Sequence, residues 1–309
     1  MKRFLLFLGL LSLLPFHLVA GSFTFTTIDP PGSTTTGAQG INDSGQVVGY
    51  YYGTGGVAHG FLLNGGIFST LDPPGSTSTD AEGINDSGQV VGGYSAGGVQ
   101  HAFLLSGGIF SVIDPPGSTF AEAVGINDSG QVVGGYQTGG VLHGFLLSGG
   151  IFTTIDPPGS ILTEAFGIND SGQVVGRYAA GGVLHGFLLS GGIFTTLDPP
   201  GSTNTLASAV NDSGQVVGAY NTAILAQQGF LLNGGIFSNI EFPGFTSQAF
   251  GINDSGQVVG AYVGAGGVGH GFLATPGPAP EPGTFGSTLS ALGLLAAWSG
   301  SRRRTSSRP

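Results

Sequence analysis

The sequence predicts an all-β repeat protein, and three observations support this prediction. The decapeptide GINDSGQVVG begins at Gly40 and returns unchanged four times, and a near copy reads AVNDSGQVVG. The Asn of this motif recurs at a spacing of 43 residues once and 42 residues four times, at positions 42, 85, 127, 169, 211 and 253. Each period is rich in Gly, β-branched and aromatic residues, with no apolar stripe at helical spacing. A period near 40 residues is typical of propellers and solenoids.

Each period contains four short strand candidates separated by turn signals. In the first copy the strands are expected at 38–42, 46–51, 59–64 and 67–72, and the turns at 43–45, 53–56 and 65–66. The continuous apolar runs Val47-Val48 and 61–63 indicate strands that are buried on both faces. Four strands in each of six 42-residue repeats predict a six-bladed β-propeller.

The two ends of the repeat region predict how the ring closes. Residues 23–29, FTFTTID, match the fourth strand of a repeat, and the last copy ends at its third strand, residues 270–273. The N-terminal strand would therefore complete the last blade, and this closure would be needed because the chain has no cysteine for a disulfide. An open solenoid with capped ends is the alternative.

Composition excludes some classes of partner. Charged residues make up 8% of the chain, and between residues 21 and 279 there are 16 acidic side chains and one basic side chain, Arg177, a formal charge of −15. Nucleic acid would be repelled by such a surface, so it is not expected as a partner.

The repeated NDSG is interpreted as a tight turn with Gly at the left-handed position, needed once in each blade. A calcium loop is the alternative interpretation. One Asp in each turn falls short of the six or more oxygen ligands that Ca²⁺ prefers, so no cofactor is expected and calcium stays only a candidate.

The copies differ mainly in the loops between strands two and three and in the segments that join blades. These loops share one face of a propeller, which is therefore the predicted recognition face. Asp80, Glu122 and Glu164 lie there, each five residues before a motif Asn, with Glu82 nearby. They form either a set of solvated loop acids or a site for a cation or sugar hydroxyls. Arg177 is the other residue that breaks the symmetry.

Histidines at the start of the third strands are expected to pair with carboxylates after the fourth strands. If Gly65-Gly66 is a two-residue hairpin turn, counting outward places His59 opposite Asp72, and the fifth copy replaces both partners together, as Gln228 and Glu241. We interpret the pairs as structural rather than catalytic or metal-binding. The pairs are His59–Asp72, His101–Asp114, His143–Asp156, His185–Asp198, Gln228–Glu241 and His270–Asp29.

The ends of the chain predict export. Residues 1–20 have the basic start, apolar run and small final residue of a secretory signal peptide, and the repeat domain is assigned to residues 21–274. Residues 275–283 are a Pro/Gly linker, and residues 284–309 combine an apolar segment with a basic tail. Membrane contact is expected only through this C-terminal segment.

This C-terminus resembles that of PEP-CTERM proteins, because Pro280-Glu281-Pro282 is followed by the apolar stretch and then by Arg302-Arg303-Arg304. The resemblance implies sorting by an exosortase after passage through the secretion machinery, in a Gram-negative bacterium that makes exopolysaccharide. The HGFLL or HAFLL and NDSGQVVG segments also resemble HAF repeats over roughly residues 23–274, which implies an extracellular location but no activity.

Together these features predict a secreted, exosortase-sorted protein of the cell surface or extracellular matrix. It is expected to be non-catalytic and to bind exopolysaccharide or another surface partner through one loop face. A cation-dependent polysaccharide lyase or hydrolase that uses the acidic residues is the alternative, and a purely structural role in cell-surface packing stays open.

Overall fold

The computed structural model describes residues 23–224 and 227–277, and these residues form 24 β-strands. The first three repeats contain β2 (Thr35–Ile41), β3 (Val47–Tyr52), β4 (Ala58–Asn64), β5 (Ile67–Leu71), β6 (Ser78–Ile84), β7 (Val90–Ala96), β8 (Val99–Ser106), β9 (Ile109–Val112), β10 (Phe120–Ile126), β11 (Val132–Thr138), β12 (Val141–Ser148) and β13 (Ile151–Ile155). The remaining strands are β14 (Leu162–Ile168), β15 (Val174–Ala180), β16 (Val183–Ser190), β17 (Ile193–Thr196), β18 (Ser202–Val210), β19 (Val216–Thr222), β20 (Gln228–Asn233), β21 (Ile236–Ile240), β22 (Ser247–Ile252), β23 (Val258–Val263), β24 (Gly269–Pro276) and β1 (Phe23–Ile28).

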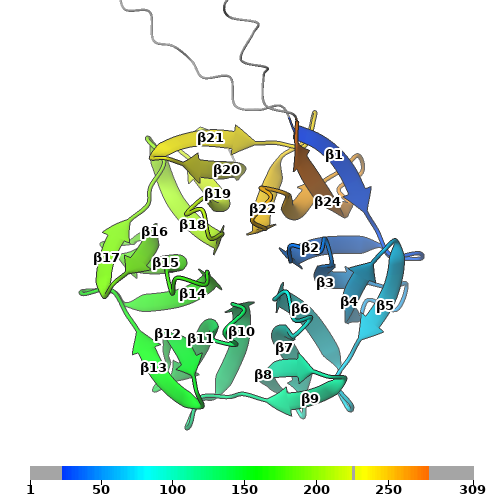
Figure 1. Cartoon of the computed structure of the whole chain (residues 1–309), viewed down its shortest axis with the longest axis horizontal. Coiled ribbons are helices and arrows are strands. Elements are labelled where there is room, and N and C mark those ends of the chain that lie inside the picture. The colour runs from blue at the N-terminus through cyan, green and yellow to red at the C-terminus, as the bar shows by residue number, and fades with distance from the viewer. Residues whose placement is uncertain (1–22, 225–226, 278–309) are drawn as a thin grey trace, which may run out of the picture. The chain divides into compact units, whose positions relative to one another are not determined.

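The strands form repeated four-stranded sheets arranged around an axis (Figure 1), which confirms the predicted all-β repeat architecture. Strands β2 to β5, β6 to β9 and β10 to β13 each form one sheet in chain order. The strands of the fourth and fifth repeats form one eight-stranded sheet. The two repeats are connected by a short parallel pairing of β16 with β18, at Leu184 and Asn204. The last sheet has the order β1-β24-β23-β22, so the N-terminal strand lies beside the C-terminal one.

Turn chemistry sets the register within each sheet. Gly65 and Gly66 have φ values of 56° and 85°, so they form a two-residue hairpin turn in which Asn64 pairs with Ile67, as predicted. At the other turn, Gly45 has a φ of 75° and donates its N–H to the Asn42 carbonyl at 3.0 Å. Each first strand is longer than predicted: β2 begins at Thr35 rather than at residue 38 because its start still pairs with β3.

The apolar core lies between neighbouring repeats. One cluster joins Val48 of the first repeat to Ala81, Ile84, Val90 and Phe103 of the second. The Val47 and Val48 side chains are 1% and 0% exposed, which confirms that the second strands are buried on both faces. A single repeat therefore has no core of its own and needs its neighbours.

Two kinds of glycine allow this close packing. A Cβ atom on Gly40 would lie 2.7 Å from the Glu82 carbonyl oxygen of the next repeat, so the first strands approach each other with their backbones. A Cβ atom on Gly49 would lie 2.0 Å from the Gly37 carbonyl oxygen of its own sheet. Glycine is required at both places because no side chain would fit.

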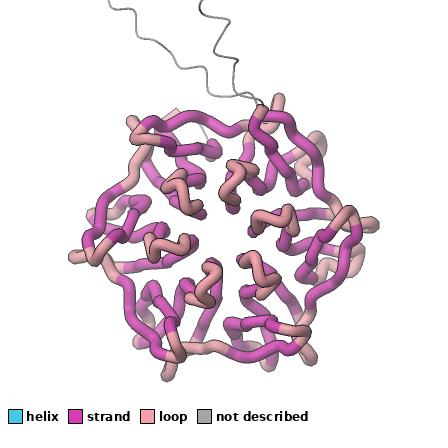
Figure 2. The backbone as a smooth tube through the Cα atoms, viewed as in Figure 1, coloured by secondary structure: helices cyan, strands magenta, loops and turns pink. Residues whose placement is uncertain are grey.

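A ring of motif asparagines connects the repeats at the axis. Asn42 donates from Nδ2 to the Asn85 carbonyl at 3.1 Å, and its Oδ1 accepts the Gln46 N–H at 2.9 Å. The same bond to the next repeat is made by Asn85, Asn127, Asn169 and Asn211. Asn253 donates to the Asn42 carbonyl at 3.1 Å, so the series returns to its start. Figure 2 shows these turns gathered around the axis.

Candidate functional site

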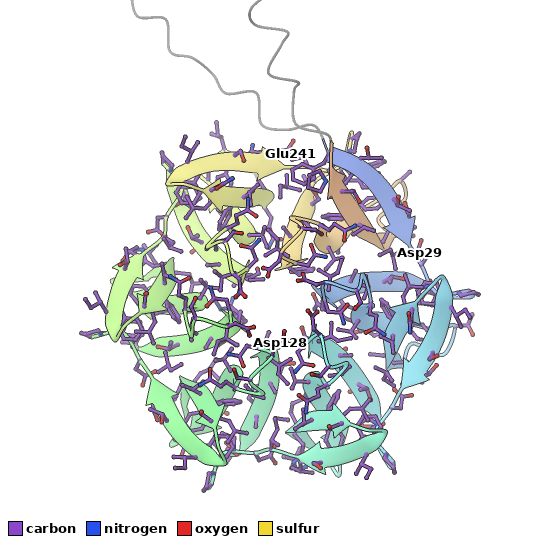
Figure 3. The ribbon with its side chains drawn as sticks, viewed as in Figure 1. Asp29, Asp128 and Glu241 are labelled. Atoms are coloured by element: carbon purple, nitrogen blue, oxygen red, sulfur yellow. The ribbon has the colours of Figure 1, made fainter. Side chains whose placement is uncertain are left out.

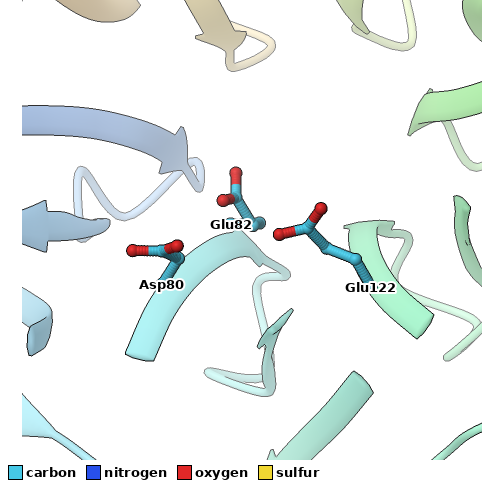
Figure 4. Close-up of side chains that lie close together, drawn as sticks. All are labelled: Asp80, Glu82 and Glu122. Atoms are coloured by element: carbon cyan, nitrogen blue, oxygen red, sulfur yellow. The ribbon is translucent and has the colours of Figure 1, made fainter. Parts of the chain in front are cut away.

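The acidic residues singled out in the sequence do not all come together. Asp80 and Glu82 lie on β6 and Glu122 lies on β10, and one carboxylate oxygen of each is within 4.8 Å of the other two. Figure 4 shows Glu122 reaching toward Glu82 from the neighbouring sheet. The first strands of two neighbouring sheets thus bring Glu122 close to Asp80 and Glu82, which lie about 40 residues earlier in the sequence.

Glu164, the fourth acid of the predicted set, is engaged differently. It lies on β14 directly opposite Arg177 on β15, and its Oε2 accepts hydrogen bonds from Nε and Nη2 of that guanidinium group. The Arg177 guanidinium also lies 5.6 Å from the centre of the Phe166 ring. The equivalent partners of Asp80 and Glu122 are Gly93 and Gly135, which offer no cation.

Burial raises the pKa values of the three carboxyl groups that, among the described residues, have no basic side chain beside them. Burial raises the pKa of Asp80 to about 6. The pKa of Glu122 is raised to about 7, first by burial and then by the charges of Asp80 and Glu164. The pKa of Glu82 lies well above its usual range because of burial and the nearby Glu122 and Asp80 charges, although a hydrogen bond with Gln39 opposes the rise. The three carboxyl groups therefore have raised pKa values, chiefly because burial disfavours their charged form.

The cluster borders a central cavity of about 410 Å³. Its wall contains Glu82, Glu122 and Glu164 on one side. At the far end it is bounded by a ring of β-branched residues that also borders a smaller cavity of about 100 Å³, and this ring consists of Ile41, Ile84, Ile126, Ile168, Val210 and Ile252. The first strands run from the variable segments toward this ring, so the acidic cluster lies on the side of the variable loops.

Sequence reasoning missed one position of the cavity wall. The residue immediately before the Gly of the repeated motif differs in every copy except two, and the six residues are Gln39, Glu82, Val124, Phe166, Ser208 and Phe250. Aligning the six copies would have shown that this position varies, although the Ala before it is the same in every copy. The cavity therefore combines carboxyl, amide, hydroxyl and aromatic groups on a repetitive scaffold.

The motif aspartates form a second axial feature that sequence reasoning did not foresee. Asp43 donates its N–H to Asp86 Oδ1 at 2.8 Å, and Asp254 donates to Asp43 Oδ1 at 2.8 Å. The other turns make the same contact, and Asp128 lies near the axis in Figure 3. One oxygen of each motif aspartate thus accepts a hydrogen bond from the backbone N–H of the aspartate in the neighbouring turn. Among the described residues, only Asp80, Glu82 and Glu122 form a group compact enough to hold a metal ion.

The predicted His–Asp pairs lie within hydrogen-bonding distance. His Nδ1 is 2.7 Å from Asp Oδ2 in His59–Asp72, His101–Asp114, His143–Asp156, His185–Asp198 and His270–Asp29. Each imidazole also lies beside a Tyr ring of the second strand, for example His59 beside Tyr51 at 5.5 Å between ring centres. These pairs recur around the ring and lie away from the cavity wall, with Asp29 at the periphery in Figure 3. Their placement fits a structural role.

The fifth repeat, with Gln228 and Glu241, has a different set of side-chain hydrogen bonds. Gln228 Oε1 accepts the Tyr220 hydroxyl at 2.8 Å. Asn239 lies between the two residues and donates from Nδ2 to Gln228 Oε1 at 3.5 Å and to Glu241 Oε1 at 3.4 Å. The amide of Asn239 thus replaces the direct contact that the other repeats make.

The predicted signal peptide at 1–20 and the sorting residues Pro280, Glu281, Pro282, Arg302, Arg303 and Arg304 lie outside the described residues. Within the described part of the chain, no helix is long and apolar enough to span a membrane.

No protein-family model matches the chain, and no curated protein matches it in sequence. It is similar to a candidate TolB from Agrobacterium tumefaciens, with 12% identity over 80% of this chain and 91% of that chain and a TM-score of 0.57. It is also similar to a catalytically inactive virginiamycin B lyase from Staphylococcus aureus, solved with quinupristin, with 11% identity over 82% of this chain and 99% of that chain and a TM-score of 0.51.

A third similar structure is the β-propeller domain of the Trilobed protease from Pyrococcus furiosus, which has an open velcro topology. The identity is 10% over 78% of this chain and 81% of that domain, with a TM-score of 0.51. At such identities the likeness concerns the fold and not the activity. The chain is therefore an all-β repeat protein with a β-propeller fold.

Proposed function

We propose that the chain is a closed six-bladed propeller that acts as a non-catalytic binding protein. The closed form is supported by the return of the asparagine ring from Asn253 to Asn42 and by the pairing of β1 with β24. The His270–Asp29 contact joins residues 241 positions apart in the sequence. Six repeats joined in this way leave no uncovered core at either end of the array.

The observation that carries the binding function is that the repeats also differ at the wall of one central cavity. Most of the ring repeats the same residues, whereas the cavity wall carries Glu82, Phe166, Ser208 and the Glu164–Arg177 pair. A cavity of about 410 Å³ into which carboxyl, amide and hydroxyl groups converge between apolar side chains has the size of a small-molecule site. A purely structural ring would have no physical need for such differences.

The proposed ligand is part of an exopolysaccharide at the cell surface. The signal peptide and the PEP-CTERM-like tail support export and sorting by an exosortase, and the net negative charge argues against nucleic acid. Aromatic rings with carboxyl and amide groups are suited to sugars, because rings pack on C–H faces while polar groups bind hydroxyls.

Calorimetric titration of the full chain with exopolysaccharide from the source organism tests this function. Saturable heat without cleavage of the polymer is expected, and it should weaken when Glu122→Gln alters the cavity. Glu241→Gln is the matched control, because it makes the same chemical change at an exposed site outside the cavity. Absence of heat for both the original protein and the control would refute binding.

The sorting step needs a separate test. Replacing Pro280, Glu281 and Pro282 by Ala in the producing bacterium should prevent release of the protein to the cell surface, while the unchanged chain is found there by cell fractionation. Equal surface amounts of both proteins would contradict sorting through this segment.

A cation-dependent polysaccharide lyase or hydrolase is the second candidate. The compact group of Asp80, Glu82 and Glu122 favours it, because carboxyl groups with raised pKa values can exchange protons near neutral pH. Measuring polymer chain length after incubation with calcium, and again with EDTA, distinguishes the candidates. Cleavage that is lost in EDTA and in Glu122→Gln would favour the enzyme.

A further inference from the structure

We propose that the central cavity is selective for an amino sugar, whose ammonium group is held by Glu82 and Glu122 while its ring lies against Phe166 and Phe250. This inference rests on the proposed binding of exopolysaccharide and narrows it to a polymer with free amino groups. It follows from the carboxyl groups and the apolar side chains that share the wall of the cavity.

The carboxyl groups of Glu82 and Glu122 have no basic side chain beside them in the described part of the chain. Arg177 is the only Lys or Arg side chain among the described residues, and it is already bound to Glu164. Glu82 and Glu122 therefore face the cavity without a basic side chain as partner. Because carboxylates bind donors with positive charge most strongly, a cationic ligand would supply this missing partner.

The apolar residues of the cavity wall argue against a bare metal ion as the ligand. Phe166, Phe250, Leu206 and Val124 contribute to the same wall, and none of them offers a ligand atom to a metal. Aromatic rings do attract ammonium groups and pack against the C–H face of a sugar ring. An organic cation with an apolar face thus contacts both the carboxyl groups and the apolar side chains, whereas a metal ion would contact only the carboxyl groups.

Two neutral polar groups on the wall are suited to ligand hydroxyls. Gln39 lies beside Glu82 in the cavity, where its amide can both donate and accept. Ser208 is only 8% exposed, lines the cavity, and has an Oγ atom with no hydrogen-bond partner in the described structure. A buried hydroxyl without a partner is costly, so a ligand group that reaches it would gain binding free energy.

The cavity limits how a polymer can enter. The Ile and Val ring bounds its far end, and a volume of about 410 Å³ has no room for a long chain. A polysaccharide would therefore insert an end or a side branch from the side of the variable loops. This geometry favours short oligomers as probes.

The test is calorimetric titration of the full chain near neutral pH with the tetramer of glucosamine and with its N-acetylated form. The two probes differ in charge at nitrogen but share the sugar ring. We expect saturable binding of the glucosamine tetramer and affinity at least about 10-fold lower for the acetylated one, as for loss of one charge-assisted hydrogen bond. Glu122→Gln should weaken glucosamine binding by a similar factor, and Glu241→Gln should not change it.

Each other outcome overturns the inference in a recognisable way. Equal or tighter binding of the acetylated tetramer would refute the role of the ammonium group while leaving exopolysaccharide binding intact. Binding of the native polymer with no binding of either tetramer would have the same meaning. If neither the tetramers nor the polymer bind, the proposed function fails as well. If calcium chloride alone gives heat that Glu122→Gln abolishes and both tetramers are silent, the site is a metal site.

Discussion

Replacing Glu122 by Gln should stabilise the protein, and more so at alkaline than at acidic pH. The pKa of the Glu122 carboxyl rises from its ordinary value of 4.5 to about 7, chiefly through burial and also through the charges of Asp80 and Glu164. The folded-state pKa is therefore higher than the unfolded-state one. The resulting penalty is absent below the unfolded pKa and complete above the folded pKa, so stability is lost as pH rises between them.

The magnitude follows from the difference between the two pKa values. One pKa unit corresponds to about 1.4 kcal/mol, so ionising Glu122 costs the folded state about 3 kcal/mol at about pH 8 and about 1 kcal/mol at about pH 5. Gln has nearly the same shape and no charge to desolvate. Its amide also has a burial cost, but that cost is the same at both pH values.

The assay is urea unfolding of the original protein and the Glu122→Gln variant at both pH values. The gain in unfolding free energy should be larger at about pH 8 by about 2 kcal/mol. Glu241→Gln, at an exposed position, should show no such difference. A variant whose stability differs from the original protein by the same amount at both pH values would refute the assignment of a raised pKa to Glu122.

Three further predictions concern the packing and the closure of the ring. Gly49→Ala should destabilise the protein by about 3 kcal/mol in urea unfolding, because its Cβ atom would lie 2.0 Å from a carbonyl oxygen, whereas Gly53→Ala, with open space around it, should have little effect. His270→Ala should speed hydrogen exchange in β1 by removing the 2.7 Å contact with the N-terminal segment; unchanged exchange there would argue against a latch. Arg177→Met leaves the Glu164 carboxylate without its cation, so the free energy of unfolding in urea should fall by about 2 kcal/mol, and an unchanged free energy of unfolding would contradict the ion pair.

The repeat period and turn residues contained most of the information about the fold. Gly65-Gly66 was sufficient to predict the register of Asn64 with Ile67, because two positive φ values leave few hairpin geometries. The same counting placed each His opposite its Asp. It did not anticipate that Asn239 would bridge Gln228 and Glu241, because the choice among several amide and hydroxyl partners depends on side-chain positions.

Less of the candidate site than of the fold could be predicted from the sequence. Asp80, Glu82 and Glu122 could be selected as residues that break the symmetry, but the sequence did not separate them from Glu164. That separation depends on Arg177, which reaches Glu164 across the β14–β15 pair.

The sequence by itself thus determined the all-β repeat, its turns and the side of the ring that varies, since local turn chemistry and periodicity fix these features. Only the tertiary structure decided which carboxyl groups face one another, which one is neutralised by Arg177, and that Phe166, Ser208 and Phe250 share their cavity. The physical reason is that these contacts join different repeats around the axis. Their distances depend on how the sheets twist and pack, which no local pattern in the chain encodes.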